Sequence, residues 1–369
     1  METTIIQWLQ SSDLQWLDSL MLFFTGFGDT LFLVIVGGIV LYAFGKKQAF
    51  WFFIQFFCGL ILVSGLKNII KRPRPYTKKG IQSIGEPTSG YAMPSGHSYT
   101  IANLSAQGIR ACHHLPQSQP ITQRELPKNL SPTDTPTIPQ IPTHKTPTSD
   151  GIPPNQLSAH PTQQKKLYAQ LQKTMTILGI VLTILVAVSR VYLGQHYPTD
   201  TIISILIAVS LSITLPKVWG KLANKECAIA LILASIALIV LVVASILAVH
   251  NSQLIIICAA TTGWFGGYYL ETRWIKYDSQ SSQLNLPSTD SIQSPPSSND
   301  PNSNGTISTQ NQIKKAIYRT LLGGLSTLTL FIILTLLFPP IPFLQWIRYL
   351  VTTLWATLGT FWLFKKLNI

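Results

Sequence analysis

Long apolar segments with almost no charged residues restrict most strongly how this chain can fold. A helix that crosses the roughly 30 Å hydrocarbon core of a bilayer needs about 17–25 mainly apolar residues. Eight segments fit this requirement, and they are 29–45, 48–66, 174–190, 198–216, 227–249, 254–270, 317–338 and 345–364. A further candidate, 98–112, contains more small and polar residues, which suit a helix packed inside a bundle. We therefore predict an all-α, polytopic membrane helical bundle with about nine transmembrane helices.

The composition excludes several classes of protein. Only 11% of the residues are charged and 47% are hydrophobic, whereas a soluble domain carries about 25% charged residues. A soluble globular enzyme and a disordered protein are therefore excluded. The net charge of +13 would also fit a nucleic-acid partner, but in membrane proteins excess Lys and Arg gather in cytoplasmic loops. We expect the bilayer, and no nucleic acid, as the partner of these charges.

The segments outside the spans divide the chain further. Residues 1–28 mix Trp and Leu with polar residues and are predicted to form an interfacial N-terminal helix. A tenth span starting near Ile5 is the alternative, but Ser11, Ser12 and Asp13 would interrupt it. Residues 113–172 and 278–312 are rich in Pro, Ser, Thr, Gln and Asn, a composition typical of disordered loops. We expect a five-helix core over 29–216 and a four-helix C-terminal extension over 217–369.

The distribution of basic residues predicts the orientation. With the amino terminus outside, most of the 27 Lys and Arg residues fall in inside loops, as cytoplasmic loops favour. The short loops agree, and they carry Lys46 and Lys47, Lys217, Lys221 and Lys225, and the terminal Lys365 and Lys366.

Three polar clusters lie at the ends of spans that reach the outer face. Lys67 follows the second span and is itself followed, after six residues, by Arg74-Pro75. Pro94-Ser95-Gly96-His97 precedes the third span, and Ser189-Arg190, His196 and Asp200 lie around the junction of the fourth and fifth. Because consecutive spans run in opposite directions, the three clusters can meet in one site.

The residue types in these clusters suit a phosphate group. Lys67, Arg74 and Arg190 would repel one another unless an anion with several oxygens lay between them, and guanidinium groups pair bidentately with phosphate. Ser95 and Gly96 begin a predicted helix, whose free N–H groups and dipole also favour an anion. A magnesium site would need two or more carboxylates, so we predict no metal.

Two histidines add the means to transfer the phosphoryl group. If a helix begins near Pro198, Asp200 can accept a hydrogen bond from one nitrogen of His196 and leave the other free to attack phosphorus. His97 would then protonate the departing oxygen. Taken singly, each cluster could consist of interface residues that extend toward the headgroups, and we assign Lys71, Arg72, Lys78, Lys79 and Arg348 to that class or to attraction of an anionic headgroup.

The three clusters together resemble the signature of the type 2 phosphatidic acid phosphatase superfamily, which includes vanadium haloperoxidases and glucose-6-phosphatase. The resemblance covers residues 15–216 and implies a helical phosphatase core. It also implies metal-independent hydrolysis of a phosphate ester or diphosphate through phosphohistidine, without a cofactor. His196, His97 and Asp200 would be catalytic, and Lys67, Arg74, Ser95, Gly96 and Arg190 would bind phosphate.

The resemblance also indicates a substrate class. A lipid phosphate fits a site at a membrane surface, with undecaprenyl diphosphate favoured and phosphatidate or phosphatidylglycerol phosphate next. In a bacterium the site would face the periplasm from the inner membrane. A sugar-phosphate phosphatase of the glucose-6-phosphatase type remains an alternative, as does a non-catalytic transporter or scaffold.

Overall fold

A computed structural model describes residues 1–12, 14–113, 160–222, 224–246, 252–277, 304–338 and 342–369, and all regular structure in these ranges is helical. The first part of the chain comprises α1 (Glu2–Gln10), α2 (Gln15–Thr25), η1 (Gly26–Gly28), α3 (Thr30–Ile39), η2 (Val40–Phe44), α4 (Lys46–Ile70) and η3 (Pro75–Thr77). The central part comprises α5 (Gly96–His113), α6 (His160–Tyr192) and α7 (Pro198–Leu222).

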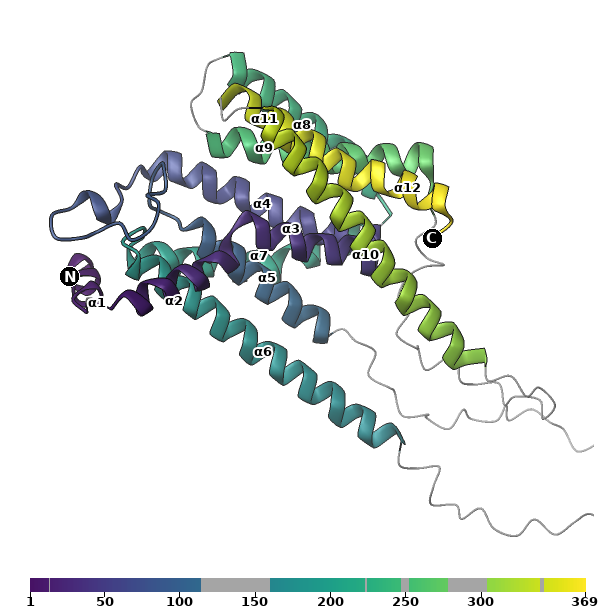
Figure 1. Cartoon of the computed structure of the whole chain (residues 1–369), viewed down its shortest axis with the longest axis horizontal. Helices are drawn as coiled ribbons and strands as arrows, with labels where there is room; N and C mark the ends of the chain where they lie inside the picture. Colours follow the sequence, from purple (N-terminus) through teal and green to yellow (C-terminus); the bar gives the residue numbers. More distant parts are fainter. Residues whose placement is uncertain (13, 114–159, 223, 247–251, 278–303, 339–341) are drawn as a thin grey trace, which may run out of the picture.

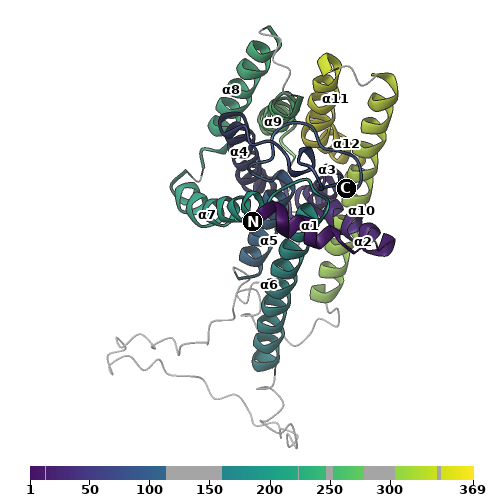
Figure 2. The same ribbon diagram turned by 90° about the vertical axis from the view of Figure 1, so that its left-hand side faces the viewer.

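The C-terminal part comprises α8 (Glu226–Ile246), α9 (Ser252–Leu270), η4 (Glu271–Ile275), α10 (Asn304–Leu337), α11 (Pro342–Leu354), η7 (Trp355–Gly359) and α12 (Thr360–Leu367). Figure 1 shows α8, α9, α11 and α12 gathered beside the bundle of α4 to α7. Figure 2 looks onto the end that carries the N-terminus, with α8, α9 and α11 on the opposite side from α6. The two groups meet where α9 packs on α4 and where α10 packs on α3 and η2.

Five helices in the described ranges are long and apolar enough to cross a membrane: α4, α7 and α8, and the segments Ala169–Tyr192 of α6 and Ile313–Leu337 of α10. The expected span 29–45 is helical from Thr30 to Phe44, where α3 passes directly into the π-helix η2, and this helix is shorter than those five. The prediction of an all-α membrane protein is therefore confirmed, and among the described residues five of the expected nine spans satisfy both length and apolarity.

The polar helix α5 lies inside the bundle, packed against α4, α6 and α7. Tyr99 is fully buried and donates a hydrogen bond to the backbone oxygen of Gln55 on α4, at 3.2 Å. Asn103 donates to the Tyr99 hydroxyl (3.0 Å), and Gln55 donates to Ser212 Oγ on α7 (2.7 Å). The polar residues that weaken the hydropathy of α5 thus join it to its neighbours, because buried polar groups require such partners.

The N-terminal segment differs from the expected single interfacial helix, because it forms two helices, α1 and α2. Ile6 of α1 is fully buried against Ile81, Val191 and Tyr197. Gln10 donates hydrogen bonds to the backbone oxygens of Tyr192 (2.7 Å) and Gln82 (3.0 Å). One face of α1 therefore packs on the loop after α4 and on the junction between α6 and α7. Trp8 of the same helix remains 73% exposed.

The two segments predicted to be disordered lie mainly outside the described residues. Their ends do not, and these ends are helical: α6 begins at His160 and α10 begins at Asn304. The predictions for 113–172 and 278–312 were therefore too long at their C-terminal sides.

Candidate functional site

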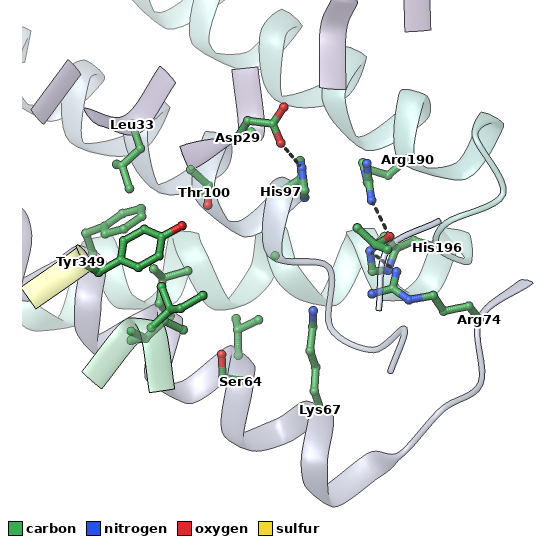
Figure 3. A pocket seen from close by; sticks show the side chains of 18 residues that line it. Asp29, Leu33, Ser64, Lys67, Arg74, His97, Thr100, Arg190, His196 and Tyr349 are labelled. Carbon is green, nitrogen blue, oxygen red and sulfur yellow. Dashed lines mark hydrogen bonds and ion pairs between the residues drawn. The ribbon is translucent and has the colours of Figure 1, made fainter. Parts of the chain in front are cut away.

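A cavity of about 230 Å³ lies where the C-terminal ends of α4 and α6 meet the N-terminal end of α5. Figure 3 shows the side chains of Lys67, Arg74, His97, Arg190 and His196 converging on it. The cavity is lined by Gly28, Asp29, Leu33, Phe56, Leu60, Val63, Ser64, Lys67, Arg74, Thr88, Gly96, His97, Thr100, Arg190, His196, Ile256, Ile257 and Tyr349. The structure thus brings residues of all three sequence clusters to one place.

Three cations at the cavity are nearly removed from solvent. Lys67, Arg74 and Arg190 are 8%, 3% and 4% exposed. Within the described part of the chain, none of them forms an ion pair with a carboxylate. Because an unpaired buried charge costs several kcal/mol, such a group of cations is favourable only around an anion.

Backbone oxygens hold the guanidinium of Arg74 in place. Arg74 donates to the carbonyl oxygens of Gly90 (2.9 Å), Ser89 (2.9 Å) and Gln195 (3.0 Å). These contacts fix the loop that follows α4 against the loop that joins α6 to α7. Sequence spacing alone could not reveal them, because backbone acceptors have no residue signature.

Arg190 is held by hydroxyl groups. It donates to Thr25 Oγ1 (2.9 Å) and to Thr88 Oγ1 (3.3 Å), and its buried Nε has no hydrogen-bond partner among the described residues. Hydroxyl oxygens are neutral, so they position Arg190 without neutralising it. Its charge remains available to a ligand.

The hydrogen bonding of His196 defines its tautomer. Arg74 Nη1 lies 3.3 Å from His196 Nε2, and a guanidinium can only donate. The lone pair of Nε2 therefore faces Arg74 and the cavity, and the proton lies on Nδ1. This is the tautomer that a nucleophilic imidazole requires.

Asp200 does not form the expected hydrogen bond with His196. The distance from His196 Nδ1 to Asp200 Oδ2 is 3.7 Å, beyond the range of a hydrogen bond. Oδ2 instead accepts the N–H of Tyr197 at 2.8 Å, and Oδ1 accepts Arg72 Nη1 at 2.6 Å. The fully buried carboxylate is oriented toward His196 but is held by these other donors.

The expectation that Arg72 extends toward the lipid headgroups is wrong, because its side chain contacts Asp200. Besides Asp200, it pairs with Glu2 of α1, and its guanidinium stacks on the Tyr197 ring, 3.8 Å from the ring centre. Its position inside the first sequence cluster was a signal for this role. The contact with Glu2 had no such signal, because it joins residues far apart in the chain.

His97 has a carboxylate partner that sequence reasoning missed. His97 Nε2 lies 2.6 Å from Oδ1 of Asp29, which precedes α3. Because a carboxylate accepts, the proton lies on Nε2, and Nδ1 is the nitrogen left for another ligand. Gly28 makes the approach possible, since a Cβ there would lie 2.7 Å from His97 Cβ.

The surroundings of both histidines disfavour their protonated forms. Burial lowers the pKa of His196 well below its ordinary value, and the charges of Arg190 and Arg74 lower it further. Burial and the Arg190 charge also lower the pKa of His97 to about 4, although Asp29 acts in the opposite direction. An anion among the cations would offset the effect of these charges and raise the pKa of both imidazoles.

Ser95, which the sequence predicts to bind phosphate, is not among the residues that line the cavity. It is fully buried, and its Oγ accepts a hydrogen bond from Ser98 Oγ at 3.0 Å. Its backbone N–H donates to the backbone carbonyl oxygen of Asp200 at 3.2 Å. This hydrogen bond joins the start of α5 to α7. Gly96 does line the cavity, in the first turn of α5, where N–H groups have no acceptor within the helix.

In the described residues, no group of three or more His, Cys, Asp or Glu side chains is arranged to hold a metal ion. The independence of the reaction from metal stays a prediction.

Comparison with known proteins identifies the family. A model described as the PAP2 superfamily matches residues 48–224, and one described as the transmembrane extension of PAP2 superfamily phosphatases matches residues 302–369. No curated protein matches the chain. A solved structure titled the first transmembrane PAP2 type phosphatidylglycerolphosphate phosphatase from Bacillus subtilis is similar, with 19% identity, a TM-score of 0.40, and coverage of 60% of this chain and 86% of that one. Because the two family models together span more than half of the sequence, the chain belongs to the PAP2 superfamily of membrane phosphatases.

Proposed function

We propose that this protein hydrolyses a lipid phosphate or diphosphate through a phosphohistidine on His196. The three buried cations without carboxylate partners carry this proposal, because a phosphate with its several oxygens is the anion that neutralises them best. Lys67, Arg74 and Arg190 would hold the phosphoryl oxygens, with the N-terminus of α5 at Gly96 as a further donor.

In the first step, His196 Nε2 attacks phosphorus and the bond from phosphorus to the ester oxygen breaks. The departing oxygen takes a proton from His97, and Asp29 and Asp200 orient the two imidazoles. In the second step, water attacks the phosphohistidine, His97 accepts its proton, and inorganic phosphate leaves with His196 restored. The substrate assists, because its negative charge raises the low pKa of His97 and supplies the protonated acid.

The lining of the cavity favours a lipid over a sugar phosphate. Away from the cations, Leu33, Phe56, Leu60, Val63 and Ile257 form its walls. Among the other lining residues Ser64, Thr100 and Tyr349 carry hydroxyls, and each sugar hydroxyl buried against the apolar walls without a partner would cost about 1–3 kcal/mol. Among lipids, undecaprenyl diphosphate remains the favoured substrate, with phosphatidate and phosphatidylglycerol phosphate next, and we propose that the site faces outward, as in a bacterial inner membrane.

The test is phosphate release by the purified protein in the presence of EDTA. We expect release from at least one of these three lipids, inhibition by vanadate, and loss of activity in His196→Ala. His113→Ala is the matched control, since His113 is the last residue of α5, the helix whose second residue is His97. Full activity of His196→Ala, or activity only after a divalent cation is added, would contradict the proposal.

A further inference from the structure

The cavity extends beyond the cationic cluster to a wall made by C-terminal helices. Ile256 and Ile257 of α9 and Tyr349 of α11 line the same cavity as the phosphate-binding side chains. In Figure 3, Tyr349 lies beside Leu33, at the side of the cavity away from Arg74 and His196, with its hydroxyl directed inward. The core and the C-terminal helices therefore line one cavity together.

Close packing holds α11 at this position. A Cβ at Gly263 would collide with the backbone oxygen of Leu350, and one at Gly267 would collide with Thr357 Oγ1. The two glycines thus let α9 approach α11 and η7 closely, as small residues do between membrane helices. Leu350 is the neighbour of Tyr349 in the sequence, so this packing also places Tyr349 at the cavity.

We propose that α9 and α11 form the binding surface for the first part of the substrate's hydrocarbon chain, with Ile257 and Tyr349 selecting for chain substrates over short esters. The proposal rests on the proposed lipid phosphatase function. It gives the C-terminal helices a direct part in substrate selection, through side chains that face the cavity.

The size and the lining of the cavity support this occupant. At about 230 Å³, it is smaller than the roughly 300–1,000 Å³ of sites that enclose drug-sized ligands. It can hold a phosphate and only the beginning of a chain, so the remainder must leave toward the bilayer. The apolar side chains at the end away from the cations favour hydrocarbon there, since burying it is favourable.

The experiment compares two substrates, dioleoyl phosphatidate in detergent micelles and p-nitrophenyl phosphate. We expect Ile257→Trp and Tyr349→Ala each to lower the ratio of kcat/KM for the lipid to that for the short ester. A fall of about tenfold corresponds to the loss of roughly two buried methylene contacts. Ile239→Trp is the matched control, because Ile239 lies on the neighbouring α8 and is 62% exposed, and its ratio should equal that of the wild type.

A binding measurement in His196→Ala protein separates this proposal from the phosphatase function. There, Ile257→Trp should weaken binding of dioleoyl phosphatidate about tenfold relative to dihexanoyl phosphatidate. If Ile257→Trp weakens binding of the long-chain lipid in this way while the wild type releases no phosphate, the phosphatase function is contradicted. The proposed binding surface for the hydrocarbon chain is then still supported. The proposed binding surface would be contradicted if Ile257→Trp and Tyr349→Ala both left the ratio of the two affinities unchanged. It would also be contradicted if both variants weakened the binding of the two lipids equally.

Discussion

At the scale of single residues, Asp200 shows how a buried carboxylate is kept close to the nucleophile. Its two oxygens are already occupied by Arg72 and by the N–H of Tyr197, at 2.6 and 2.8 Å. Arg72 thus sets the position from which Asp200 faces Nδ1 of His196, 3.7 Å away. We infer that Arg72 is a positioning residue that acts through Asp200.

Arg72→Ala should therefore lower kcat more than it changes KM. Removing a charged hydrogen bond costs about 1.5–3 kcal/mol, which corresponds to roughly a 10–100-fold fall in rate. Steady-state kinetics on phosphatidate measure this, with Lys78→Ala, an exposed change in the same loop, as the control. Arg72→Lys should restore part of kcat, since an ammonium can still hold the carboxylate. A rise in KM at constant kcat would contradict the positioning role.

The two histidines predict how stability depends on pH. The pKa of each is lower in the folded protein than its ordinary value, with His97 at about 4. The unfolded chain therefore binds more protons below about pH 6.5, so folding stability should decrease as the pH falls from 6.5 toward 4.

Thermal unfolding in detergent across this pH range measures the effect. Saturating vanadate should reduce the loss, because an anion among the cations favours the protonated histidines. The substitution His97→Gln should also reduce the loss of folding stability between pH 6.5 and pH 4. A melting temperature that rises on acidification, or a loss that neither vanadate nor His97→Gln changes, would contradict the assigned environments.

At the residue scale, sequence patterns identified the side chains whose charges or nucleophilic atoms face the cavity. They did not identify the residues that hold them. Asp29 and Thr88 belong to no cluster, and their partners His97 and Arg190 lie far away in the sequence. Ser95 stays a predicted phosphate ligand, and the contact of its hydroxyl with Ser98 could not be predicted either, since which way a hydroxyl turns depends on its neighbours in space.

At the scale of elements, the contact between η1 and α5 determines where His97 lies. Gly28 leaves no room for a side chain beside the first turn of α5. Gly28→Ala should push His97 away from the cavity, and overpacking of this kind typically costs about 1–3 kcal/mol.

We expect Gly28→Ala to lower kcat and the thermal stability together. The control is Gly65→Ala on α4, where an added Cβ meets no atom within 4 Å. Both variants are measured by phosphate release and by thermal unfolding. Equal behaviour of the two variants would show that the approach of η1 to α5 is unimportant for the site.

Hydropathy predicted α4, α7 and α8 well because each combines length with few charges. The span 29–45 is helical as well, because α3 and the π-helix η2 run without a break from Thr30 to Phe44 and end at Gly45, whose φ is 98°. Hydropathy does not register the change from α-helix to π-helix within it. The sequence also could not predict that α1 packs on protein, because an amphipathic helix face can pack on protein or on lipid.

At the scale of the whole molecule, the proposed site lies at one end of the bundle. The loop that carries Lys78 follows α4 at this end, whereas Lys217 lies near the other end of α7. With the four cysteines replaced by serine, Lys78→Cys should react with an impermeant maleimide added outside intact cells. Lys217→Cys should react only after lysis. The reverse pattern would contradict the outward orientation.

The sequence predicted that the clusters meet, because alternating spans return the chain to the same face. It could not predict that α9 and α11 would complete the cavity. Their contribution depends on how the C-terminal helices pack around α4, and Ile257 and Tyr349 carry no motif.

Whether His196 becomes phosphorylated during the reaction can be measured by trapping the intermediate. The protein is mixed with phosphatidate labelled in its phosphate, quenched in alkali, where phosphohistidine survives, and analysed by peptide mapping. We expect label on the peptide containing His196 in the wild type, and none in His196→Ala. Label on another residue, or label that persists in His196→Ala, would contradict this expectation.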